Sequence, residues 1–148
     1  MSTLKNKRNF FRFQKSKIDT TNPDNTLRIQ LESMRRGSTQ IVYQLASPSN
    51  RLSTAQGGYN YPVFDTMVRS PTYVPLLNFQ RYKVLQKKMF NNQYQADILI
   101  INNGFSYKFR FQMSLQPRDI IDIHPSLGSF IMKPGHAPVW RTDSVFPL

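Results

Sequence analysis

Most of the side chains in this sequence that can do chemistry are cations, and they are unevenly placed. Residues 1–88 hold 15 Lys and Arg against 4 Asp and Glu, whereas residues 89–148 hold 5 against 4, so the first part carries nearly all of the net charge of +12. Lys and Arg that neutralise phosphates release condensed counterions, and this favourable term needs no base-specific fit. The asymmetry therefore predicts that a polyanion, foremost a nucleic acid, binds one portion of the molecule.

The basic residues expected to contact RNA gather in a first segment, in an Arg pair and along two later elements. They are Lys5, Lys7, Arg8, Arg12, Lys15 and Lys17, then Arg35 and Arg36, then Arg81, Lys83, Lys87 and Lys88, and finally Lys108 and Arg110. In residues 1–17, Phe10, Phe11 and Phe13 lie between the cations, and such rings stack on exposed bases. This segment is interpreted as an RNA-binding arm, with a mitochondrial targeting peptide as the alternative.

Catalytic chemistry has little support in the sequence. The only imidazoles are His124 and His136, there is a single Glu32, and there is no cysteine. No spacing matches a zinc site or a hydrolase signature, so we expect no enzyme activity, no metal and no cofactor. Asp122 and His124 alternate on an expected strand and are interpreted as a surface pair. A small-molecule substrate is likewise not expected.

The longest strongly apolar run, Ile98–Ile101, is far too short to cross a bilayer, so we expect no membrane partner.

The elements expected to carry the basic residues are helices in the first part and a hairpin in the second. Spacing of apolar residues predicts helices over 26–36, 63–69 and 75–92, a short strand over 40–45 and a loop over 47–58. The helix over 75–92 would carry Arg81 to Lys88 beside a strand bearing Lys108 and Arg110. Together they would form one basic ledge.

The clearest pattern is a hairpin. An apolar run at 98–101 leads into Asn102-Asn103-Gly104, a tight-turn signal, and residues 105–113 then alternate strictly between apolar and polar. A further short strand is expected over 120–123. The tail over 126–148 contains three prolines and is expected to be irregular.

These elements predict an α+β fold with two short helices packed on a small sheet that contains a β-hairpin. The expected organisation is a basic arm (1–17), an irregular segment with a short helix (18–61), a small α+β RNA-binding domain (62–125) and a Pro-rich wrapping tail (126–148).

The order of elements over about 62–143 resembles the small RNA-binding domain of the family of small-subunit ribosomal protein four, especially its organellar versions. The matching residues are 64–69 and 78–88 for two helices, 98–104 for strand and turn, 117–123 for the closing strand and 137–140 beyond it. The resemblance implies that the two-helix unit binds ribosomal RNA, which adds Arg69 to the expected contacts. A shorter stretch, 66–71, is similar to a signature of small-subunit ribosomal protein ten.

The expected function is therefore that of a structural protein of the mitochondrial ribosomal small subunit, which binds and stabilises ribosomal RNA beside neighbouring ribosomal proteins. The AT-rich coding suggested by many Asn and aromatic residues fits an organelle. Two alternatives stay open: a viral or phage coat protein with a basic arm, and an accessory subunit of a mitochondrial respiratory complex.

Overall fold

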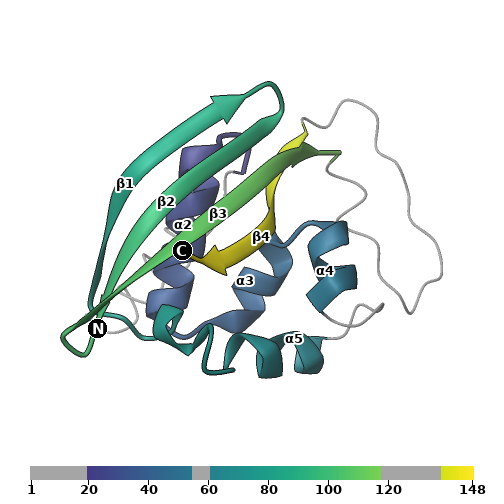
Figure 1. Cartoon of the computed structure of the whole chain (residues 1–148). Coiled ribbons are helices and arrows are strands. Elements are labelled where there is room, and N and C mark those ends of the chain that lie inside the picture. The colour runs from purple at the N-terminus through teal and green to yellow at the C-terminus, as the bar shows by residue number, and fades with distance from the viewer. Residues whose placement is uncertain (1–19, 55–60, 118–137) are drawn as a thin grey trace, which may run out of the picture.

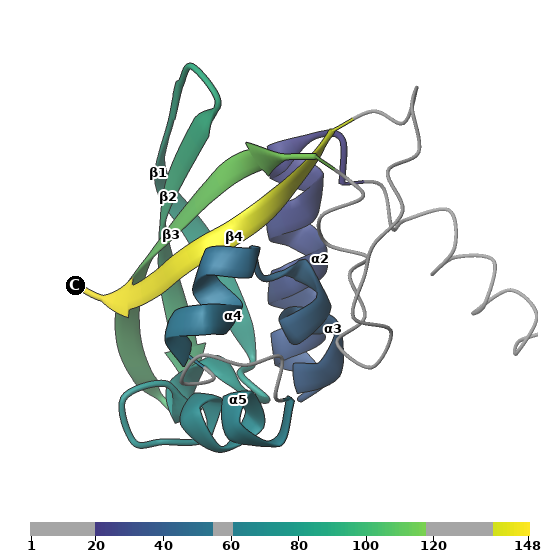
Figure 2. The same ribbon diagram turned by 90° about the vertical axis from the view of Figure 1, so that its right-hand side faces the viewer.

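The computed structural model describes residues 20–54, 61–117 and 138–148. Within these ranges, four α-helices and a 3-10 helix precede or flank a sheet of four antiparallel strands in the order β1-β2-β3-β4. The labelled helices all lie against one face of the curved sheet, and none of them covers the other face (Figures 1 and 2). The expected α+β class, with helices packed on a sheet that contains a hairpin, is confirmed.

The longest helix in the described ranges, α2 (Pro23–Arg35), has clear signals at both ends. Asn22 caps its start, because the Asn22 side-chain oxygen accepts from the amide of Asp24 at 2.8 Å, and Pro23 occupies the first turn. At its end Gly37 adopts φ +75°, and the Ser38 amide donates to the Ser33 carbonyl at 2.8 Å. Helix α2 thus begins three residues before the expected helix and ends where Gly37 predicts.

Two segments after α2 differ from expectation. The expected strand over 40–45 is the helix α3 (Thr39–Leu45), and the expected loop over 47–58 contains the helix α4 (Pro48–Thr54). In α3 the buried residues Thr39, Val42 and Leu45 recur every three positions, which is one face of a helix. Tertiary packing of that face overrides the strand propensity of its β-branched residues.

The expected helix over 63–69 is confirmed as α5 (Tyr61–Val68), but the expected helix over 75–92 is wrong. Only the 3-10 turn η1 (Val74–Leu76) is helical there, and Arg81–Phe90 is the strand β1. Asn78 and Asn91 adopt φ +57° and +54°, so the chain turns on both sides of β1. Pairing with β2 outweighs the helix propensity of the Lys, Gln and Leu residues in this segment, so the segment forms a strand.

The expected hairpin is confirmed as β2 (Gln93–Asn102) and β3 (Phe105–Gln116). Asn103 and Gly104 between them have φ +52° and +81°, the positive values that a two-residue turn of this kind requires.

The C-terminal tail is not irregular throughout, because Val139–Pro147 forms β4, which pairs with β3 along its length. Pro147 stands at the last position of this edge strand, where a missing amide costs no ladder bond. The rest of the expected tail, the expected strand over 120–123 and the arm over 1–17 lie outside the described residues.

One apolar core joins parts of the chain that the expected domain boundaries separate. Leu31 from α2, Phe64 from α5, Ile98 from β2 and Trp140 from β4 all belong to it. The core therefore crosses the expected boundaries at 62 and 125, and the segment over 18–61 contributes the helices α2 and α3 to it.

Candidate nucleic-acid interface

The two faces of the sheet follow from the register of its strands. On β2 the residues Ala96, Ile98 and Ile100 are fully buried under the helices, while the alternating Asp97 and Leu99 are only half-buried. Directly paired residues of neighbouring antiparallel strands share a face. The register therefore assigns to the second face, here called the outer face, a set of side chains that includes Arg81, Lys83, Gln86, Lys88, Phe90, Gln93, Gln95, Asp97, Leu99, Ile101, Lys108, Arg110, Gln112 and Ser144.

A row of cations crosses this outer face. Lys83 and Lys108 both pair with Leu99, from opposite sides, so the two exposed ammonium groups flank one apolar residue. Their strands lie two spacings apart, about 10 Å. Arg81 lies two residues before Lys83 on the same side of β1, and no acidic partner is found for any of the three cations within the described part of the chain. These three charges are available to a ligand.

Arg110 shares this face but is already paired. Its Nε lies 2.8 Å from Asp97 Oδ1, and its Nη2 lies 3.1 Å from Asp97 Oδ2. The hydrogen bond from Arg110 lowers the pKa of Asp97 below its ordinary value. Because a carboxylate occupies the fork of the guanidinium, the expected RNA contact of Arg110 finds no support in this geometry.

Lys87 points to the other side of β1, as its pairing with the buried Ala96 shows. Its Nζ lies 3.1 Å from Asp24 Oδ1 at the start of α2, and the same oxygen accepts from the Tyr94 hydroxyl at 2.6 Å. The Tyr94 hydrogen bond is the main reason that the pKa of Asp24 falls below its ordinary value. Lys87 thus ties β1 to α2 instead of extending the row of Arg81 and Lys83.

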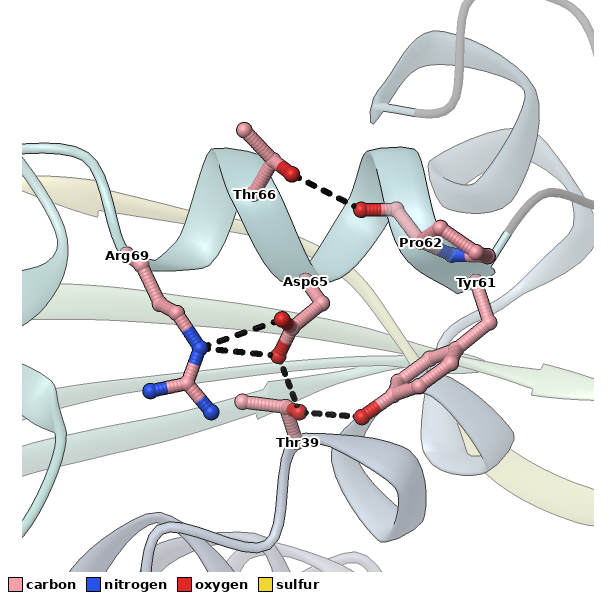
Figure 3. Close-up of polar contacts among 6 residues, drawn as sticks. All are labelled: Thr39, Tyr61, Pro62, Asp65, Thr66 and Arg69. Carbon is pink, nitrogen blue, oxygen red and sulfur yellow. Dashed lines mark hydrogen bonds and ion pairs between the residues drawn. The ribbon is translucent and has the colours of Figure 1, made fainter.

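The expected contacts on the helices lie in the layer behind the sheet. Arg35 pairs with Glu32 one turn earlier at 3.3 Å, and Arg36 also has an interaction partner. Arg69 donates to both carboxylate oxygens of Asp65 at 3.1 Å (Figure 3). Sequence reasoning placed these arginines with the other cations, but the fold separates them from the outer face.

Asp65 itself joins α5 to the start of α3. The Thr39 hydroxyl donates to Asp65 at 2.5 Å, so the Tyr61 hydroxyl, 2.6 Å from Thr39, is the donor of its own bond (Figure 3). The Thr39 hydrogen bond, followed by that of Arg69, lowers the pKa of Asp65. This network fixes one helix against another, which gives Arg69 a structural role.

A hollow that sequence reasoning missed lies at the other end of the outer face, near the turn between β1 and β2. It has a volume of about 370 Å³ and is lined by Lys88, Phe90, Gln93, Tyr94, Gln95, Gln112, Met113 and Asp143. Phe90 is 68% exposed. The alternation of Gln95 with buried neighbours was a usable signal, but Lys88 and Phe90 were assigned to a helix and so were not placed beside it.

A second, larger hollow of about 520 Å³ runs between α2 and β1, beside the Asp24–Lys87 pair. Its wall combines apolar side chains such as Leu27 and Val84 with the polar groups of that pair. Within residues 20–54, 61–117 and 138–148, no group of three His, Cys, Asp or Glu side chains is arranged to hold a metal ion. In those ranges there is also no helix of the length and apolar character needed to cross a membrane. Asp122 and His124 are outside them.

Comparisons with known proteins give no relative for this chain. No family model, no curated protein and no solved structure matches it. The resemblance to the ribosomal family implied a second helix over residues 78–88, but these residues belong mostly to the strand β1.

Proposed function

We propose that this protein binds RNA without catalysing a reaction, and that the outer face of its sheet is the surface that meets the RNA. The observation that carries the proposal is the row formed by Lys83 and Lys108 with Arg81 beside it. Three exposed cations from two strands point to the same side of a rigid sheet, and no helix in the described ranges covers them.

A sheet of this kind fits RNA for a physical reason. Cations fixed on neighbouring strands keep a constant spacing, so they contact successive phosphates without first paying the entropy of ordering a loop. Leu99 and Ile101 are half-buried beside these cations and offer an apolar contact surface to the sugars and bases of the RNA. Phosphate contacts position such a protein, and they account for affinity more than for sequence preference.

The particle to which we assign the protein is the small subunit of a mitochondrial ribosome, with neighbouring ribosomal proteins as further partners. Support for this finer proposal comes from the sequence alone: the acid-free basic segment 1–17 with its three Phe residues, and the organelle-like composition. Gradient sedimentation with and without ribonuclease tests it. We expect one copy per small subunit and release after digestion.

The alternatives give other results in the same experiment. Shells of many identical copies would identify a coat protein. A membrane-associated complex that ignores ribonuclease would identify an accessory respiratory subunit. Either result contradicts the ribosomal assignment.

The RNA-binding surface is tested by two double variants that remove the same charge. Lys83→Gln with Lys108→Gln removes two cations from the outer face, whereas Arg35→Gln with Arg69→Gln removes two from the helix layer. Binding to an 11-nucleotide single-stranded RNA is measured over a range of salt concentrations. We expect the first variant to lower the slope of log affinity against log salt by roughly one to two units, since each lost phosphate contact removes about 0.7. Equal slopes for the two variants would contradict the proposed surface.

A further inference from the structure

The hollow beside Phe90 has the parts of a site for a single nucleobase. Its lining residues come from all four strands, with Lys88 and Phe90 on β1 and Asp143 on β4. The aromatic residue, the amides and the carboxylate are brought together only by the register of the sheet. Lys88 pairs with Gln95, and Gln95 pairs with Gln112.

Phe90 is the stacking surface. It is 68% exposed at the end of β1, where the chain turns through Asn91, and so it has a face available to a ligand. Stacking of a base on an aromatic side chain strengthens binding roughly five- to 150-fold and requires the base to leave its neighbours. A base bound on Phe90 is therefore an unstacked one, which points to single-stranded RNA.

The amides of the hollow are held in one orientation by a chain of hydrogen bonds. The Ser144 hydroxyl donates to Gln112 Oε1 at 2.7 Å, and Gln112 Nε2 donates to Gln95 Oε1 at 3.4 Å. The chain ends at Gln95 Nε2, whose two hydrogens have no partner within the described residues. Gln95 thus presents donors to whatever enters the hollow, and the ammonium of Lys88 is a further donor.

Asp143 supplies the complementary acceptor. It is the extra residue on β4 where the register with β3 shifts, between Thr142 and Ser144. In the described ranges it has neither a hydrogen-bond nor an ion-pair partner, although the face around it is basic. A carboxylate is best satisfied by two adjacent N–H donors, and among the bases guanine carries N1–H and N2–H₂ side by side next to the acceptor O6.

We propose that this hollow binds one unstacked guanine of a single-stranded RNA. Phe90 stacks on the ring, Asp143 accepts from N1–H and N2–H₂, and Gln95 with Lys88 donates to O6. This inference rests on the proposed function, because the cations at the other end of the outer face hold the flanking phosphates.

The test uses the full chain and a set of 11-nucleotide RNAs made of uridine except at the central position. That position carries guanine, adenine, cytosine, uracil or no base. Affinities are measured by fluorescence anisotropy at fixed salt. Guanine is expected to bind roughly tenfold more tightly than the abasic oligomer, the size expected for a stacked base, and more tightly than the other three bases. A guanine oligomer that binds no better than the abasic one, or a stronger preference for another base, overturns the proposal.

Two exposed phenylalanines provide matched variants. Phe90→Ala is expected to remove the advantage of guanine over the abasic site. Phe105→Ala, which truncates a 66% exposed ring at the opposite hairpin turn, is expected to leave it unchanged. Asp143→Asn is expected to keep the stacking gain but reduce the preference for guanine over adenine. Equal effects of the two Phe variants would overturn the assignment of the site.

Failure of this inference can be told apart from failure of the proposed function. If all oligomers bind with equal affinity and a steep salt dependence, the outer face binds RNA but the hollow does not read a base. If none of them binds, the proposed function and the hollow are overturned together.

Discussion

The two faces of one sheet show how differently the same strands are used. On the inner face, Ile98, Ile100, Phe109 and Phe111 have at most 1% of their surface exposed, and they pack against the helices. On the outer face, the residues that alternate with them are polar, charged or half-buried. Changes on the inner face should therefore act on stability, and changes on the outer face should act on binding.

The largest effect is expected from placing the same charge on each face in turn. Ile98→Lys buries an unpaired ammonium group under the helices, and we expect it to abolish cooperative folding, a loss of more than about 4 kcal/mol. Leu99→Lys, one residue later, faces outward between Lys83 and Lys108 and should leave the fold intact. Thermal unfolding followed by circular dichroism compares the two.

The variant Leu99→Lys also tests RNA binding by the outer face. Because Leu99→Lys adds a cation between Lys83 and Lys108, it should raise the salt slope of RNA binding by roughly 0.7 units. Unfolding of both variants to the same extent would show that the outer face is covered by another part of the molecule.

A smaller loss is expected when a ring is removed from the inner face. Phe111 is fully buried and its neighbour Gln112 is not, so Phe111→Ala should lower the free energy of unfolding by about 3–5 kcal/mol. Gln112→Ala should change it by less than about 1 kcal/mol. Chemical denaturation measures both, and similar losses would contradict the assignment of the faces.

How far the sequence predicts this division depends on how local the signal is. The turn at Asn103-Gly104 and the alternation over 105–113 lie within a dozen residues, and they correctly predict β2, β3 and the two faces of β3. The strand β1 could not be predicted in this way, because its Lys, Gln and Leu residues favour a helix and only pairing with β2 makes it a strand. The strand β4 pairs with β3 across more than twenty residues of chain, a contact that no local pattern indicates.

The candidate site could be predicted only in part, because some of its contacts also join residues far apart in the sequence. The sequence placed Lys108 on an outward face and grouped it with Arg81 and Lys83, and the structure puts all three on the outer face. It did not separate Lys87 and Arg110 from them, because their partners Asp24 and Asp97 are brought close only by the fold.

A moderate effect is expected on the inner face, where Tyr94 contacts the start of α2. Tyr94→Phe removes the hydroxyl that donates to Asp24. We expect the free energy of unfolding to fall by about 1 kcal/mol near pH 7, because the hydrogen bond to the charged carboxylate is lost and water replaces it only in part. Because the hydrogen bond lowers the pKa of Asp24, the stabilisation is fully present above the unfolded pKa of about 3.9 and is lost as the pH falls through the folded value. Urea denaturation at pH 7 and pH 2.5 checks this, and the difference between wild type and variant should be smaller at pH 2.5.

The smallest expected change in stability comes from removing the Asp97 carboxylate. The same substitution is also expected to change RNA binding by the outer face. Asp97→Asn leaves Arg110 without its carboxylate, so a neutral pair becomes a free cation two residues from Lys108 on the same side of β3. Stability should fall slightly at pH 7, and the difference from wild type should fade below pH 3.9, because the pKa of Asp97 is lowered in the folded state. RNA binding should change in the opposite direction, with a salt slope steeper by roughly 0.7 units. Adding Arg110→Gln to Asp97→Asn should return the slope to that of wild type. A slope that ignores both substitutions would mean that RNA does not reach Arg110, and would confine the interface to Arg81, Lys83 and Lys108.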